Sequence, residues 1–123
     1  MTVRIVVADD SETIRALVAT IIGKEGFETA TASDGVEALA LIREHRPELL
    51  IVDAVMPRMS GYDVCRALQT DADGPHPHVI MLTGAGEGAG RRRALEAGVD
   101  EVVAKPFSPA RLRARVREIL EDA

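Results

Sequence analysis

The sequence is poor in aromatic residues and in cysteine. It contains no tryptophan, one tyrosine and two phenylalanines, so aliphatic side chains must fill the core. Its one cysteine, Cys65, cannot form an internal disulfide, which favours a reducing compartment. The sequence also lacks a charged leader followed by an apolar stretch, and it lacks an apolar run long enough to cross a bilayer. We therefore expect a cytoplasmic protein that makes no membrane contact.

An excess of positive charge is absent as well. The formal net charge is −5, whereas domains that bind nucleic acid usually carry a basic excess, so we expect no direct binding of nucleic acid. Hydrophobic residues make up 46% of the chain and charged residues 28%, a composition typical of a folded protein. A length of 123 residues suits one domain with one core, and we assign residues 1–123 to it.

Short apolar segments alternate with amphipathic segments along the chain. The apolar segments, at residues 3–8, 29–32, 49–53, 79–83 and 101–104, have the lengths of strands. Between them, apolar residues recur at helical spacing, as at Ile14, Leu17, Val18 and Ile21. This alternation predicts an α/β fold. We expect one doubly wound, flavodoxin-like parallel sheet of five strands in the order 2-1-3-4-5, together with five helices.

Residues 84–90 contain four glycines. Because glycine is a poor helix former, we expect a flexible loop here and a helix that begins near Gly90 or Arg91. The segment also fits the dinucleotide-binding pattern G-x-G-x-x-A, but that pattern belongs after the first strand of its unit and needs an acidic residue after the next strand. The next predicted strand here ends at Lys105, which favours the loop.

Reactive polar residues stand at the ends of four of the predicted strands. They are Asp9 and Asp10 after the first strand, Asp53 at the end of the third, Thr83 at the end of the fourth and Lys105 after the fifth. Parallel strands place their carboxyl ends at one edge of the sheet, where open α/β sheets bind ligands. We therefore expect these five side chains to share one crevice.

The predicted crevice suits phosphoryl transfer assisted by a metal ion. Carboxylates at short range repel one another, and a hard cation such as Mg²⁺ or Mn²⁺ relieves that repulsion. Lys105 can pair with a phosphoryl oxygen, and Thr83 can donate a hydrogen bond from its hydroxyl. Asp53 lies on the central strand and is the best candidate for a nucleophile that forms an aspartyl-phosphate.

These polar residues belong to motifs spread over the whole chain. The motifs are Asp9-Asp10, Asp53 with Met56-Pro57 and Gly61, Leu82-Thr83, Ala97-Gly98 and Lys105-Pro106-Phe107. With them the chain resembles the receiver domain of two-component response regulators. The resemblance implies that Asp53 accepts a phosphoryl group from a phosphohistidine on a sensor histidine kinase or on a histidine phosphotransfer protein.

The resemblance also implies roles for the other residues of the crevice. Asp10, Asp53 and the backbone carbonyl of Val55 would bind Mg²⁺ or Mn²⁺ directly, with Asp9 acting through water. Thr83 and Lys105 would contact the phosphoryl oxygens, and a cis peptide bond would precede Pro106. Residues that would support the switch are Gly84, Ala85, Val102, Pro106 and Phe107.

A receiver domain is a signalling switch rather than an enzyme in the turnover sense, although it assists its own phosphorylation and dephosphorylation. We expect phosphorylation to change partner binding through the face that runs from the fourth predicted strand, at residues 79–83, to the fifth and last predicted helix. The implied partner is a downstream protein or a covalently linked output domain. The resemblance also implies a homodimer, formed through the fourth predicted helix, the strand at residues 101–104 and the last predicted helix.

One position departs from the receiver pattern. Receivers usually carry tyrosine or phenylalanine three residues before the lysine, where this chain has Val102. The aromatic ring is thought to turn inward on activation, and valine has no ring to move. We expect signalling to depend instead on residues 84–90 and the helix that follows.

Other functions remain open on the same architecture. A phosphatase of the haloacid-dehalogenase type also uses an aspartate nucleophile, but it needs D-x-D-x-T after its first strand, and Asp9 to Thr13 does not fit. A flavin or dinucleotide carrier would place its phosphate where Asp9, Asp10 and Glu12 repel it. An inactive receiver used only for docking is disfavoured because every pocket residue is present.

Overall fold

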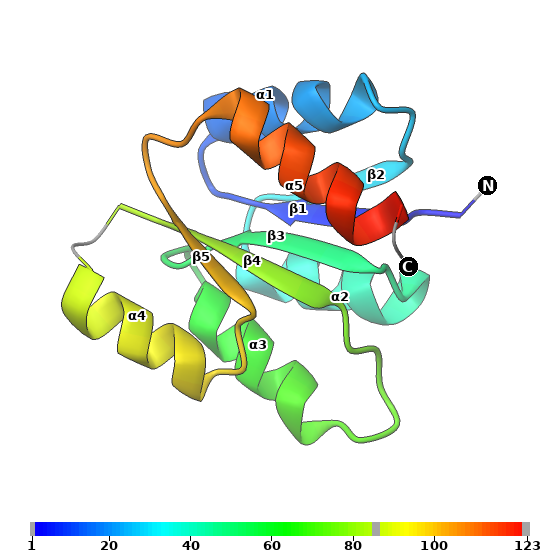
Figure 1. Ribbon diagram of the computed structural model, residues 1–123. Helices are drawn as coiled ribbons and strands as arrows, with labels where there is room; N and C mark the ends of the chain where they lie inside the picture. Colours follow the sequence, from blue (N-terminus) through cyan, green and yellow to red (C-terminus); the bar gives the residue numbers. More distant parts are fainter. Residues whose placement is uncertain (1, 85–86, 122–123) are drawn as a thin grey trace.

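The computed structural model describes residues 2–84 and 87–121. Strands and helices alternate along the chain in these residues (Figure 1). They are β1 (Ile5–Ala8), α1 (Glu12–Gly23), β2 (Thr29–Ala32), α2 (Gly35–His45), β3 (Leu49–Asp53), α3 (Gly61–Thr70), β4 (His78–Thr83), α4 (Glu87–Glu96), β5 (Glu101–Ala104) and α5 (Pro109–Glu121). Among the described helices, none combines the length and the apolar character that a membrane span requires.

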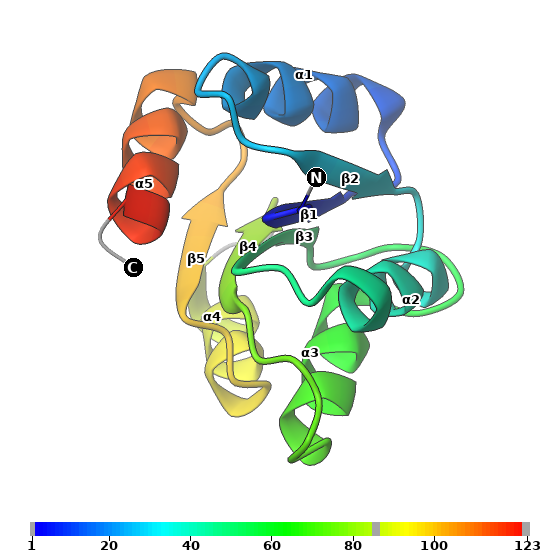
Figure 2. The same cartoon turned by 90° about the vertical axis from the view of Figure 1, so that its right-hand side faces the viewer.

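The five strands form one parallel sheet in the order β2-β1-β3-β4-β5, which confirms the predicted topology. Helices α1 and α5 cover one face of the sheet, and α2, α3 and α4 cover the other (Figure 2). Since successive side chains of a strand point to opposite faces, the strand residues alternate between two cores. Ile5 and Val7 pack under α1 and α5, whereas Val6 and Ala8 pack against the α2 side.

Three helices begin at side chains that cap their first turn. Ser11 accepts a hydrogen bond from the Ile14 N–H (3.2 Å), and Asp34 accepts one from the Glu37 N–H (2.8 Å). Ser60 begins α3 with a complete capping box. Because Ser11 rather than Asp10 caps α1, the Asp10 carboxylate stays exposed at the carboxyl edge of the sheet.

The start of α4 corrects the sequence analysis. The helix begins at Glu87, so the expected start near Gly90 or Arg91 is wrong. The prediction relied on the local glycine content, but tertiary packing can outweigh intrinsic helix propensity. The packing here is the burial of Ala94, which is fully buried against the sheet. Gly84 precedes the helix, and Ala85 lies outside the described residues.

Cys65 has the structural role that its position in an amphipathic segment suggests. Its side chain is buried in the core beneath α3. Burial, together with the nearby Asp100 charge, raises the pKa of the Cys65 thiol to about 12. The thiol therefore stays protonated at neutral pH and behaves as a small apolar side chain.

Candidate functional site

The predicted polar residues meet at the carboxyl edge of the sheet. The register pairs Asp53 with Leu82 and Thr83 with Ala104, so the ends of β3, β4 and β5 lie side by side. The end of β1 is brought to the same edge by its pairing with β3. Sheet topology thus gathers residues that are far apart in the chain.

Asp9, Asp10 and Asp53 form an acidic cluster. One carboxylate oxygen from each lies within 4.8 Å of the others. Asp9 is fully buried and Asp53 is 7% exposed, whereas Asp10 faces solvent. Oxygen ligands on one partly open edge are the donor set that Mg²⁺ or Mn²⁺ accepts, with coordination positions left for water and phosphate oxygens. The residues present therefore fit a divalent cation.

Lys105 bridges two of these carboxylates. Its Nζ lies 3.1 Å from an Asp9 oxygen and 3.3 Å from an Asp53 oxygen. Burial pushes the pKa of Lys105 down, but the hydrogen bond from Lys105 to Asp9 and the charges of both aspartates outweigh it, so the pKa is raised. The ammonium is therefore held in place and charged at the point where an anionic group on Asp53 would sit. The Lys105–Pro106 peptide bond is cis, as the resemblance implied.

The Asp53 carboxylate is electrostatically strained. Burial and the Asp9 charge raise its pKa, and the Lys105 ammonium and the Val55 backbone N–H offset only part of this effect. Burial is the larger cause, and the Asp9 charge adds to it. A bound dication would reduce the repulsion between the Asp9 and Asp53 carboxylates.

Gly61 allows the segment after β3 to fold back onto Asp53. A Cβ atom at this position would lie 2.2 Å from the backbone oxygen of Asp53, so only glycine fits. The Gly61 N–H also donates a hydrogen bond to the Ala54 carbonyl at 3.0 Å. The glycine of the sequence motif therefore sets the shape of the loop that carries Val55.

A hollow opens beside Asp53 between the sheet edge and α4. Its lining consists of Asp53, Ala54, Val55, Tyr62, Thr83, Gly84, Gly90 and Arg93. Thr83 is 7% exposed and stands in the wall of the hollow together with Asp53, as predicted. Tyr62 and Arg93 could not be assigned to this region from the sequence, because the contact between α3 and α4 has no corresponding sequence motif.

The residues expected to support the switch lie around this edge. Val102 is half-buried on β5 and packs on the α3 and α4 side of the sheet, whereas Phe107 packs on the α1 and α5 side. Gly84 is exposed, and a Cβ there would meet nothing within 4 Å. Val55, whose carbonyl the resemblance assigns to the metal ion, is 74% exposed.

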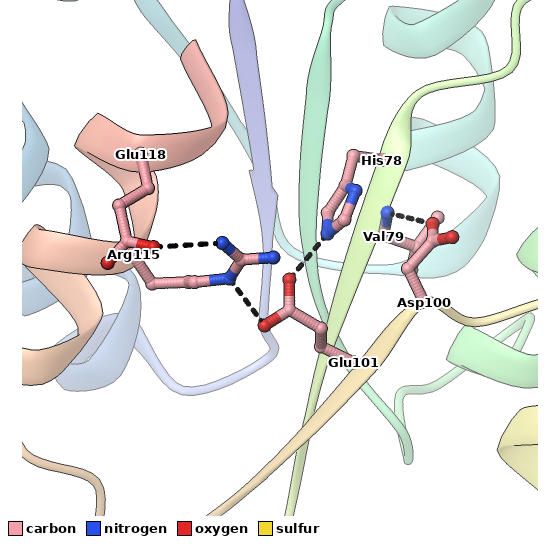
Figure 3. Close-up of polar contacts among 6 residues, drawn as sticks. All are labelled: His78, Val79, Asp100, Glu101, Arg115 and Glu118. Atoms are coloured by element: carbon pink, nitrogen blue, oxygen red, sulfur yellow. Dashed lines mark hydrogen bonds and ion pairs between the residues drawn. The ribbon is translucent and has the colours of Figure 1, made fainter. Parts of the chain in front are cut away.

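A second polar cluster lies away from the acidic edge, at the start of β4 and β5 (Figure 3). Glu101 accepts a hydrogen bond from Arg115 of α5 (2.7 Å) and pairs through its other oxygen with His78. Arg115 also pairs with Glu118 at 3.2 Å. His78 is the first residue of β4. This network ties α5 to the edge strand and was not anticipated from the sequence.

Comparison with known proteins agrees with the geometry. The family description "Response regulator receiver domain" matches residues 5–117. The chain is 43% identical over 120 residues to the probable transcriptional regulator ycf27 of Porphyra purpurea, covering 98% of this chain and 48% of that protein. It is 40% identical over 114 residues to the DNA-binding response regulator MtrA of Mycolicibacterium paratuberculosis, covering 93% of this chain and 49% of the relative. The chain thus spans about half the length of these curated relatives.

A solved structure gives the same result at the level of the fold. The receiver domain of the Francisella response regulator 1452 superposes with a TM-score of 0.88 at 28% identity, over 97% of each chain. The family match covers most of the chain, and the superposition includes the sheet edge described above. The chain belongs to the family of response regulator receiver domains.

Proposed function

We propose that this domain is a phosphorylation-controlled switch whose phosphoacceptor is Asp53. The observation that carries the proposal is the convergence of Asp9, Asp10 and Lys105 on the Asp53 carboxylate, with carboxylate oxygens within 4.8 Å and the ammonium at 3.3 Å. This arrangement supplies a nucleophile, a place for a dication and a cation for the phosphoryl oxygens. The donor is a phosphohistidine on a sensor histidine kinase or a histidine phosphotransfer protein.

The chemical step follows from the placement of these groups. An Asp53 carboxylate oxygen attacks phosphorus, an O–P bond forms as the N–P bond breaks, and the electron pair of the broken bond stays on the imidazole nitrogen. Lys105 stabilises the phosphoryl oxygens, and Thr83 donates a hydrogen bond to one of them. Both residues line the edge where Asp53 opens to solvent.

A divalent cation has a defined place in the proposal. Asp10, Asp53 and the Val55 carbonyl would hold Mg²⁺ or Mn²⁺ directly, and Asp9 would act through water. When bound, the ion supplies positive charge that offsets the charge of the phosphoryl oxygens. The acidic cluster of Asp9, Asp10 and Asp53 supports this assignment.

The output of the switch is proposed from the relatives. Two of them are named as a transcriptional regulator and as a DNA-binding response regulator, and each is about twice as long as this chain. We assign residues 1–123 to one receiver domain that controls a downstream protein or a covalently linked output domain in the cytoplasm, without touching nucleic acid itself. The face from β4 to α5 would change partner binding, and α4, β5 and α5 would form a homodimer contact.

The test is phosphorylation by a small donor. Acetyl phosphate with Mg²⁺ should add one phosphoryl group to the wild-type chain, detected by intact mass spectrometry, and EDTA should prevent it. Asp53→Asn should abolish the addition. Asp73→Asn is the matched control. Asp73 is exposed in the loop before β4, so this substitution removes the same charge far from the acidic cluster.

Three outcomes would contradict the proposal. Phosphate released in large excess over protein from a small phosphate ester would indicate a haloacid-dehalogenase-like phosphatase. A wild-type chain that stays unmodified at saturating acetyl phosphate and Mg²⁺ would indicate an inactive receiver that serves only for docking. Equal labelling of wild type and Asp53→Asn would place the phosphoacceptor elsewhere.

A further inference from the structure

Arg93 of α4 lies over the ring of Tyr62 of α3. The guanidinium carbon is 4.1 Å from the ring centroid, which is a close cation–π contact. Tyr62 is only 4% exposed, whereas Arg93 is exposed, so the arginine stands on the outer side of the ring. Both residues line the same hollow as Asp53 and Thr83.

The hollow between Arg93 and Asp53 has small residues in its lining. Ala54, Gly84 and Gly90 contribute almost no side-chain bulk, and a Cβ built at Gly84 would meet nothing within 4 Å. The small lining residues leave space for a long, flexible side chain such as arginine to turn toward Asp53. The lining leaves room for an anionic group that projects from the Asp53 carboxylate.

Arg93 has no competing carboxylate among the described residues. Within the part of the chain that the structure describes, its contact is the Tyr62 ring and it makes no ion pair. Lys105, by contrast, is already shared between Asp9 and Asp53. Phosphorylation replaces the single negative charge of the Asp53 carboxylate by nearly two on the phosphoryl group, and Arg93 is a cation beside the hollow that pairs with no carboxylate among the described residues.

We propose that Arg93 senses the phosphoryl group: when Asp53 is modified, the guanidinium leaves the Tyr62 ring and pairs with the phosphoryl oxygens across the hollow. The inference rests on the proposed function of Asp53. The driving force is the exchange of an exposed cation–π contact for a charge-assisted contact, which a guanidinium can make with two oxygens at once. The movement would pull the second turn of α4 toward the sheet edge.

This device accounts for signalling without an aromatic residue on β5. Val102 has no ring to move, but the contact between Arg93 and Tyr62 joins α4 and α3 directly. Breaking it on phosphorylation changes the surface of α4 and uncovers the Tyr62 ring. The surface that a partner binds would thus depend on whether Arg93 contacts the Tyr62 ring or the phosphoryl group on Asp53.

The chain offers a direct probe of this movement. Tyr62 is the one tyrosine and tryptophan is absent, so a tyrosine ring signal in NMR or in fluorescence belongs to Tyr62 alone. The experiment adds Mg²⁺ and beryllofluoride, a phosphoryl mimic, and follows the Tyr62 ring resonances and the Arg93 Nε–H resonance. Bound ¹⁹F resonances report separately whether Asp53 has taken up the mimic.

We expect both sets of resonances to shift in the wild-type chain and in Arg92→Ala, the matched control that removes the same charge from an exposed neighbour on α4. Arg93→Ala should still bind beryllofluoride, with an affinity lowered about fivefold and no response of the Tyr62 ring. Bound ¹⁹F signals with unmoved Tyr62 and Arg93 resonances in the wild type would overturn this inference alone. Absence of bound ¹⁹F signals would overturn the proposed function together with it.

The wild-type spectra decide the question even if Arg93→Ala is poorly folded. Equal affinities of Arg93→Ala and Arg92→Ala for beryllofluoride, in variants with the same melting temperature, would also overturn the inference. Arg93→Lys should recover part of the affinity, since an ammonium keeps the charge but cannot make the two-oxygen contact.

Discussion

The Lys105 ammonium lies 3.1 Å from a carboxylate oxygen of Asp9, although 96 residues separate the two in the chain. Asp9 is fully buried, and the Ser11 N–H donates a hydrogen bond to its other carboxylate oxygen at 2.9 Å. A buried carboxylate without a cation is costly. The Lys105–Asp9 pair therefore stabilises the folded domain and also holds the Lys105 ammonium beside Asp53.

Lys105→Met should lower the free energy of unfolding at pH 7 by about 1–3 kcal/mol in the absence of metal, since Asp9 loses its cation. Urea unfolding followed by circular dichroism measures the change. Lys24→Met is the control, because Lys24 is exposed at the end of α1, and it should change stability by less than about 0.5 kcal/mol. Equal effects of the two substitutions would refute a stabilising role for the Lys105–Asp9 pair.

Asp53→Asn should stabilise the metal-free domain at pH 7. The folded-state pKa of Asp53 is raised, first by burial and then by the Asp9 charge, so its ionised form costs stability once the pH rises above the ordinary value. Removing the charge should add about 0.5–1 kcal/mol. The difference should vanish in acid, where the wild-type carboxyl is protonated. A variant less stable than wild type at pH 7 in EDTA would show that the contact with Lys105 outweighs the repulsion.

Gly61→Ala should destabilise the domain by about 2–4 kcal/mol, because the added Cβ would lie 2.2 Å from the Asp53 carbonyl oxygen. Gly23→Ala is the matched control. Gly23 ends α1, and a Cβ there meets nothing within 4 Å, so this substitution should stabilise by about 0.5–1 kcal/mol. Thermal unfolding of both variants would measure the contrast. A Gly61→Ala domain as stable as wild type would mean that the loop after β3 relaxes freely.

The residues of the acidic site were predictable because their positions follow from sheet topology alone. Once residues 49–53 and 101–104 are parallel strands, Asp53 and Lys105 must reach the same edge. Their side chains alone could not identify the site, but their place at strand ends did.

The contacts between elements were not predictable in the same way. The start of α4 at Glu87 depends on packing that residues 84–90 do not encode locally. The contact of Arg93 with Tyr62 requires knowing that α3 and α4 are neighbours, and the pairing of His78 with Glu101 requires the register of β4 and β5. In the sequence alone, Arg93, His78 and Glu101 look like ordinary polar surface residues.

Glu101 gives the last prediction, because it joins two elements through one side chain (Figure 3). Burial pushes its pKa up, but the hydrogen bonds and charges of Arg115 and His78 outweigh burial, so the pKa is lowered. A lowered folded-state pKa means stability that is present above the ordinary pKa of glutamate and lost as the pH falls through the folded value. Glu101→Gln should therefore be less stable than wild type at pH 7, by about 1 kcal/mol, and equal to it in strong acid.

Glu118→Gln separates this network from a general effect of charge. Glu118 pairs with the same Arg115, but its side chain is 61% exposed, so its removal should cost less than about 0.5 kcal/mol at any pH. Urea unfolding of both variants across an acid pH series measures the difference. If Glu101→Gln and Glu118→Gln follow the same curve, the contact of Glu101 with His78 contributes nothing. If only Glu101→Gln loses stability at pH 7, the contacts of Glu101 with Arg115 and His78 help to hold the edge strand β5 against α5.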